Sequence, residues 1–154
     1  MTERHPRPAP PTARDLMRET ELLIPLGMSV GAAGGLLDAA GCGVAPVVDS
    51  RGRCVGVFTA ADYRRWLDRV GSDADLVTGP ASADEVRFHI TGRFAAATPD
   101  AGVGELLHRL DAAADPFLVI LDRQARPRGI VCALDVLVAE SDCTRAESEL
   151  VTAD

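Results

Sequence analysis

Gly-Val-Phe-Thr-Ala-Ala-Asp, at residues 56–62, returns as Gly-Ile-Val-Cys-Ala-Leu-Asp at residues 129–135. Each copy follows an apolar run that ends in an aspartate, at residues 45–49 and at residues 118–122. Both pairs of segments are 73 positions apart, from 56 to 129 and from 45 to 118. Such a constant offset predicts two copies of one supersecondary unit, and a twofold repeat predicts two equivalent sites, one in each copy.

The composition is that of one globular body. The chain has 154 residues, and two units of about 60–70 residues would each be marginal alone, so we expect them to pack together. The formal net charge of −7 argues against binding to nucleic acid or to an anionic membrane, because both need a basic face. It leaves open a small anion held by local arginines.

The four cysteines do not have the spacing of a metal site. None belongs to a Cys-x-x-Cys pair, and no histidine lies at ligand spacing from them, so we predict free thiols in a reducing compartment. The N-terminus is rich in proline and lacks the apolar centre of a signal peptide. The longest uncharged stretch, residues 22–37, is interrupted by Pro25 and by glycines. We therefore expect a cytoplasmic protein with no membrane segment and no metal.

Apolar periodicity and turn residues divide the chain into repeated elements. Each copy is expected to begin with a leading helix, at residues 12–19 and 84–90, followed by a strand, a helix, two strands and a second helix. This alternation predicts an α/β fold of mixed sheets covered by helices. The expected segments are a disordered proline-rich tail at 1–11, a first repeat at 12–70, a linker at 71–83, a second repeat at 84–141 and an acidic C-terminal helix or tail at 142–154.

Thr59 and Asp62 are the first candidate functional residues. A threonine followed three residues later by an acid, where a strand meets a helix, has the form of a capping box, and helix capping alone would explain it. The same helix start offers backbone N–H groups and a positive dipole end to a phosphate. A carboxylate there can also accept two hydrogen bonds from the diol of a ribose. The residue pair by itself leaves both interpretations open.

The ordered set of motifs resembles the tandem form of the CBS domain family, named after cystathionine β-synthase. That family's motif has a glycine, two or three apolar residues, serine or threonine and then, three positions later, aspartate or asparagine, as at residues 56–62. Residues 45–52 and the opening Asp-Leu-Met at residues 15–17 also match the family pattern. The resemblance implies two β-α-β-β-α repeats related by a pseudo-twofold axis, with clefts between them in which many members bind adenine nucleotides.

Carried over residue by residue, the resemblance implies two nucleotide sites. Site one has Thr59 by the phosphate, Asp62 on the ribose hydroxyls, and Ala45, Pro46, Leu23 and Ile24 around the adenine. Site two has Cys132, Asp135, Leu118, Val119 and Ala97. Cys132 departs from the family's serine or threonine, and Val119 stands where the first copy has a proline. Because a thiol is a weak hydrogen-bonding group, we expect site two to be the weaker.

The resemblance implies a regulatory module rather than an enzyme, and no nucleophile, base or metal set is evident in the sequence. His89, Arg18, Arg87 and Arg93 are either further ligand contacts or ordinary solvated side chains. We expect a stand-alone module that binds AMP, ADP or ATP without a further cofactor, forms a homodimer and signals to an effector protein. The alternative is a protein-interaction or dimerisation module with no nucleotide ligand.

Overall fold

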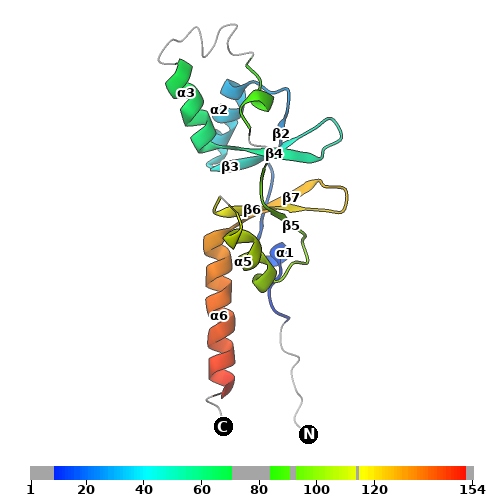
Figure 1. Cartoon of the computed structure of the whole chain (residues 1–154), viewed down its shortest axis with the longest axis vertical. Coiled ribbons are helices and arrows are strands. Elements are labelled where there is room, and N and C mark those ends of the chain that lie inside the picture. Colours follow the sequence, from blue (N-terminus) through cyan, green and yellow to red (C-terminus); the bar gives the residue numbers. More distant parts are fainter. Residues whose placement is uncertain (1–8, 71–83, 91–92, 114, 152–154) are drawn as a thin grey trace.

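The computed structural model describes residues 9–70, 84–90, 93–113 and 115–151, with side chains up to residue 145. Most of the predicted N-terminal tail and all of the predicted linker lie outside the described residues. Two sheets lie one above the other, each with helices on its outer face (Figure 1). The first sheet has the order β2 (Ile24–Pro25), β3 (Val44–Val48), β4 (Cys54–Thr59). The second has the order β1 (Arg18–Glu19), β7 (Pro127–Cys132), β6 (Phe117–Leu121), β5 (Ala96–Ala97).

The repeat in the sequence reappears in the pairing of the strands. β2 runs parallel to β3 with Ile24 opposite Val47, and β5 runs parallel to β6 with Ala97 opposite Ile120. The next pair is antiparallel in both sheets, and both ladders shift register at the same equivalent place, after Val47 and after Ile120. The predicted fold of two similar α/β repeats with mixed sheets is confirmed.

Two helices pack on the outer face of each sheet. They are α2 (Val30–Ala40) and α3 (Ala60–Val70) in the first repeat, and α5 (Val103–Asp111) and α6 (Ala133–Val151) in the second. Their ends follow local chemistry, as α2 shows. Ser29 Oγ accepts a hydrogen bond from Ala32 N (3.2 Å) at its start, and Gly41 ends it with a left-handed φ of 66°. Within the described residues, no helix combines the length and apolar character needed to cross a membrane.

The leading segment of each repeat packs on the other repeat. The N-terminal segment consists of α1 (Ala13–Leu16) and β1, and β1 pairs with β7 of the second repeat. The short 3-10 helix η2 (Val86–Phe88) lies against the first repeat. There Val86 is fully buried in the core, and its N–H donates to Met28 O (2.8 Å). The two repeats therefore exchange their leading segments: each leading segment belongs to one repeat in the sequence and packs on the other repeat in the structure.

The leading helices predicted at residues 12–19 and 84–90 are wrong in extent. The first is one helical turn followed by the two-residue strand β1, and the second is a three-residue 3-10 helix. A helix of one or two turns gains few internal hydrogen bonds. Residues 18–19 instead gain ladder hydrogen bonds along the otherwise open edge of β7, so the tertiary contact overrides the local preference.

Three apolar clusters hold the fold together. One lies between the first sheet and its helices, around Phe58 and Trp66, and a second lies in the same place in the second repeat, around Leu106 and Leu118. The third joins the two sheets and consists of Val57, Phe117, Val119 and Ile130. The central strands are thus covered on both faces, which explains why β3 and β6 are apolar throughout.

Candidate ligand-binding site

The first motif forms a complete capping box at the start of α3. Asp62 Oδ2 accepts hydrogen bonds from Thr59 N (3.0 Å) and Thr59 Oγ1 (2.9 Å), and Thr59 Oγ1 accepts one from Asp62 N (3.1 Å). The other carboxylate oxygen, Oδ1, pairs with Arg65. The side chain of Asp62 is 10% exposed and that of Arg65 is 72% exposed. Because Arg65 is exposed, it can turn away and leave Oδ1 to a ligand. Oδ2 then keeps the hydrogen bonds of the helix cap while Oδ1 binds the ligand.

The second motif reproduces the backbone of the first but not its side-chain contacts. Ala60 N donates to Gly43 O and Ala133 N donates to the equivalent Pro116 O, both at 2.9 Å, so the two strand-to-helix junctions match. Among the described side chains, no hydrogen bond joins Cys132 to Asp135 in the first turn of α6. A thiol in place of the threonine hydroxyl is too weak a group to complete the box.

The apolar residues that the resemblance assigned to the adenine lie on both faces of the sheets. Four are buried between a sheet and its own helices: Ile24, Ala45, Ala97 and Leu118. Val119 is fully buried between the two sheets, and Pro46 is buried opposite Val57. Leu23 is 41% exposed and offers its side chain to a ligand. Ile24, Leu118 and Val119 are fully buried, backbone included, so in this conformation they are not exposed to a ligand.

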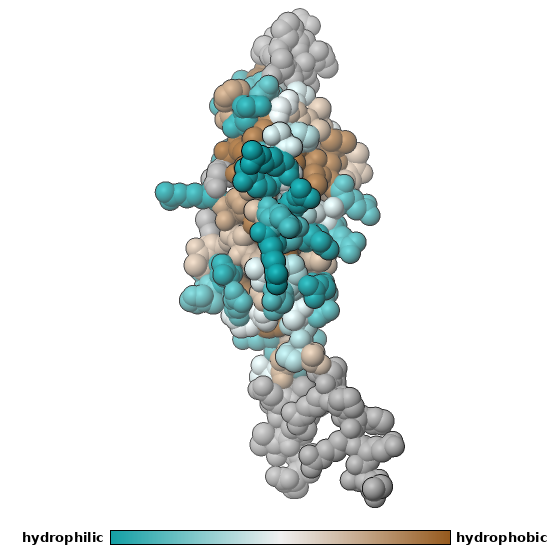
Figure 2. Space-filling view, turned by 90° about the vertical axis from the view of Figure 1, so that its right-hand side faces the viewer, coloured by the Kyte–Doolittle hydropathy of each residue, from teal (hydrophilic) through white to brown (hydrophobic). Residues whose placement is uncertain are grey.

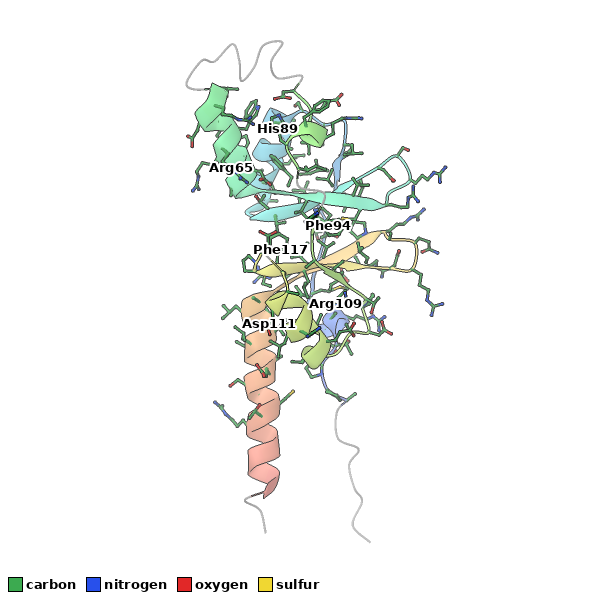
Figure 3. The ribbon with its side chains drawn as sticks, in the orientation of Figure 1. Arg65, His89, Phe94, Arg109, Asp111 and Phe117 are labelled. Atoms are coloured by element: carbon green, nitrogen blue, oxygen red, sulfur yellow. The ribbon has the colours of Figure 1, made fainter. Side chains whose placement is uncertain are left out.

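Asp62 lies at the edge of a pocket of about 580 Å³. The pocket lies between α3 and the leading segment of the second repeat, which contains η2 and packs on the first repeat; we call it the exchanged segment. The pocket is lined by Asp62, Arg65, Asp68, Arg69, Phe88, His89 and Ile90. Figure 3 shows Arg65 and His89 on the helical side of the first repeat. Guanidinium groups pair well with phosphate, and the ring of Phe88, which is 73% exposed, offers a face on which a base can stack. The pocket thus presents groups that suit each part of a nucleotide.

A side-chain network holds one wall of this pocket against the first repeat. His89 Nε2 lies 2.7 Å from Asp84 Oδ2, and His89 Nδ1 lies 2.9 Å from Arg69 Nη2. Trp66 Nε1 donates to the same Asp84 oxygen at 3.1 Å. Because an arginine can only donate, these partners assign the proton of the histidine ring to Nε2 and make Nδ1 an acceptor. The network connects α3 to the exchanged segment, and two of its members, Arg69 and His89, line the pocket.

The equivalent pocket beside Asp135 has a different charge. It has about 470 Å³ and is lined by Asp15, Leu16, Arg18, Leu134, Asp135, Val138, Ala139 and Asp142. By the offset of the repeat, Val138 and Asp142 stand where the first pocket has arginines, and Asp15 stands where it has Phe88. Three carboxylates and one arginine disfavour an anionic ligand. The side chains that line the pockets are a second reason, besides Cys132, to expect a weaker site here.

Sequence patterns alone do not single out Arg65, Arg69 or Phe88. Helical spacing could have found the arginines, because they follow Asp62 by three and seven positions and so lie on the same side of α3. Phe88 could not have been found, since its place beside α3 depends on the exchange of leading segments. His89, a sequence candidate, lies in the pocket wall. In the part of the chain that is described, no three potential metal ligands gather closely enough to hold an ion.

Comparison with known families identifies the first repeat as a member of one family. The family model of the CBS domain matches residues 13–69. The matched part contains Thr59 and Asp62, whereas the second repeat, in which Cys132 departs from the family motif, lies outside it. A search of curated proteins found no match to the chain.

Solved structures resemble the chain over most of its length. The CBS domain pair of protein MJ0100 superposes with a TM-score of 0.68 at 18% identity, over 85% of this chain and 96% of that one. CBSX2 from Arabidopsis thaliana gives 0.68 at 19%, over 88% and 97%. ATU1752 from Agrobacterium tumefaciens gives 0.66 at 20%, over 88% and 98%. At these identities the likeness concerns the fold. Residues 13–69 are therefore a CBS domain, and the chain as a whole is folded as a tandem CBS-domain pair.

Proposed function

We propose that this CBS-domain pair is a regulatory module, not a catalyst, that binds a cytoplasmic adenine nucleotide beside Asp62 and signals its binding to a partner protein. The CBS domain pair of MJ0100 was solved in complex with 5′-methylthioadenosine and S-adenosyl-L-methionine, and CBSX2 in complex with AMP. All of these ligands carry an adenine base on a ribose ring. The observation that carries the proposal is the pocket in which the motif carboxylate lies beside two arginines and an exposed aromatic ring.

Each part of the pocket has a role in this proposal. Asp62 accepts hydrogen bonds from the ribose hydroxyls through Oδ1, after Arg65 has released that oxygen. Arg65 exchanges the carboxylate for a phosphate and, with Arg69, neutralises the negative charge of the ligand. The Thr59 hydroxyl keeps the helix cap and faces the phosphate end. The adenine stacks on the exposed ring of Phe88. The apolar residues that the resemblance assigned to the adenine do not line this pocket: Leu23, Ile24, Ala45 and Pro46.

A protein-interaction module without a nucleotide is the second candidate. The observation that favours it is on α6, where Leu134, Leu137 and Val138 are each more than half exposed. Leu134 and Val138 are four positions apart, so their side chains project from the same side of the helix. An exposed apolar surface on a helix suits contact with a second copy of the chain, and a closed twofold dimer is the commonest arrangement of that kind.

Calorimetric titration with AMP, ADP and ATP distinguishes the two candidates. Asp62→Asn keeps an acceptor for Thr59 and so keeps the helix cap, but it removes the carboxylate. Loss of a hydrogen bond to a charged group costs about 1.5–3 kcal/mol, which corresponds to about 10- to 150-fold weaker binding. Asp135→Asn, the matched variant in the second repeat, should leave the affinity unchanged. If the wild type binds none of the three nucleotides, the interaction module is the better account. If Asp135→Asn alone abolishes binding, the site is assigned to the wrong repeat.

A further inference from the structure

The turns that join the central strands of the two repeats are built alike. In the β3–β4 turn, Asp49 Oδ1 accepts hydrogen bonds from the backbone N–H groups two and four positions later, at 2.9 and 3.0 Å. In the β6–β7 turn, Asp122 Oδ1 does the same at 2.9 and 3.0 Å. The hydrogen bond from Arg53 N, opposed in part by desolvation, holds the pKa of Asp49 below its ordinary value. Both aspartates thus serve to shape the turns.

The two turns meet at one edge of the molecule. Cys54 N donates to Ala125 O at 2.8 Å, which links the hairpin of the first repeat to that of the second. In Figure 1 both hairpin tips point to the right, whereas α3 and α6 begin on the left. The tips therefore form a surface separate from the pockets beside Asp62 and Asp135.

A groove of about 460 Å³ runs over these turns. It is lined by Arg51, Arg53, Arg123, Gln124, Ala125 and Arg126. Four of the six lining residues are arginines, and none is a carboxylate, although the chain as a whole carries a net charge of −7. Figure 2, which views this edge of the molecule, shows hydrophilic side chains gathered across its middle. The groove is thus a basic surface on an acidic protein.

The neighbouring groove shows that this concentration of positive charge is local. That groove has about 550 Å³ and contains Arg14, Arg123 and Arg128. These arginines share their groove with three carboxylates, those of Glu19, Asp100 and Asp122. Charge is balanced there, whereas over the hairpin tips the arginines outnumber the two turn aspartates.

The arginines of the hairpin groove retain donors for a ligand. Arg53 Nε donates to Asp49 Oδ2 at 3.2 Å, and this ion pair uses one of the five N–H donors of the guanidinium group. Four like charges around one groove repel one another, and an anion placed among them relieves that repulsion. Guanidinium groups bind phosphate with paired hydrogen bonds, which favours phosphate over a simple monovalent anion.

We propose that this groove binds a compact anion carrying two or more phosphate groups. The groove has the volume of a small-ligand site, for which about 300–1,000 Å³ is typical. A long polyanion would extend over the acidic remainder of the surface. A compact one interacts mainly with charges within a Debye length of about 8–10 Å. Because each repeat contributes one turn to the groove, binding there also strengthens the contact between the repeats. This site is independent of the nucleotide pocket beside Asp62.

The test is calorimetric titration of the full chain with inorganic tripolyphosphate, without metal ions, at low and at physiological salt. We expect wild-type binding that weakens as salt rises, and at least about tenfold weaker binding by the double variant Arg51→Gln/Arg126→Gln. The control is Arg64→Gln/Arg145→Gln, which changes the net charge equally at two exposed positions outside the groove. It should bind nearly as the wild type does. Arg65→Gln/Arg69→Gln, which removes the two arginines of the pocket beside α3, should also retain tripolyphosphate binding.

Three results would overturn the proposal. One is no binding of tripolyphosphate by the wild type up to millimolar concentration at low salt. Another is equal weakening in both arginine double variants, which would show that net charge alone matters. The third is loss of binding in Arg65→Gln/Arg69→Gln, which would place the anion in the pocket beside α3. Arg51→Gln/Arg126→Gln should still bind AMP. This result would show that the groove and the nucleotide pocket are separate sites, so that the two proposals can fail independently.

Discussion

Replacing Asp62 by alanine should destabilise the ligand-free protein more than the same change at Asp135. Asp62 accepts hydrogen bonds from the backbone N–H and the hydroxyl of Thr59 at the positive end of α3. The N-cap hydrogen bond from the backbone N–H of residue 62 to Thr59 Oγ1 survives this change. Losing hydrogen bonds to a charged group costs about 1.5–3 kcal/mol, and losing a negative charge in the first helical turn costs about 0.3–1 kcal/mol. The ion pair with the exposed Arg65 adds little. The expected cost is about 2 kcal/mol.

The same change at Asp135 removes a charge near a helix start but no capping box. Its expected cost is therefore about 0.3–1 kcal/mol. For a protein of this size, 1 kcal/mol corresponds to about 2–4 °C in the melting temperature. We expect a fall of about 4–8 °C for Asp62→Ala and of about 1–4 °C for Asp135→Ala. Circular dichroism melts without nucleotide would measure both, and urea midpoints would give the free energies of unfolding.

Cys132→Thr is the reciprocal test of this reasoning. The substitution places a hydroxyl at the position equivalent to Thr59 and should complete the second capping box. We expect a gain of about 0.5–1 kcal/mol. The gain should be smaller but still present when Asp135 is alanine, because the new hydroxyl can still accept a hydrogen bond from the backbone N–H of residue 135, as Thr59 Oγ1 does from residue 62. Equal losses at Asp62 and Asp135, or no gain from Cys132→Thr, would show that the capping box does not distinguish the two repeats.

Three further predictions follow from single positions. Ala125 has a left-handed φ of 61°, so Ala125→Gly should raise stability by about 0.5–1 kcal/mol in urea unfolding, and a loss would refute this account. A Cβ added at Gly34 would lie 2.1 Å from a Tyr63 ring atom, whereas at Gly35 it would meet no neighbour within 4 Å. Gly34→Ala should therefore cost about 1–3 kcal/mol while Gly35→Ala costs nothing. If α6 forms the dimer contact, Leu137→Glu should halve the mass measured by light scattering at tens of micromolar, and an unchanged dimer would exclude this surface.

Most of the fold could be predicted because the information is local and occurs twice. Ser29 and Gly41 mark the ends of α2 through capping chemistry that is independent of the rest of the molecule. The continuous apolar run of β3 predicts a strand covered on both faces, and the structure shows this for β3 and for its equivalent β6. The turn after β6, at residues 122–126, has no glycine, whereas the equivalent turn of the first copy has Gly52. The structure explains it, since Ala125 takes the left-handed conformation that Gly52 has in the first repeat.

The candidate site could be predicted only in part. The spacing of Thr59 and Asp62 is sufficient to form a capping box, because both residues lie within one strand-to-helix junction. The assignment of apolar residues to an adenine pocket stays a prediction. Several of those residues, such as Ile24 and Leu118, are buried in the cores of their own repeats. Alternation along a strand indicates which residues share a face, but not what that face packs against.

The sequence by itself determined the twofold repeat, the order of the strands and helices, and the two motif positions, because each depends on short-range periodicity or on self-similarity. Tertiary structure decided how the leading segments are exchanged, and hence that Phe88 lies beside Asp62. It also brought Arg51 and Arg126 to one groove, although they are far apart in the chain. The physical reason is that long-range contacts depend on which buried surfaces and open strand edges fit one another, and a local pattern does not specify that partner.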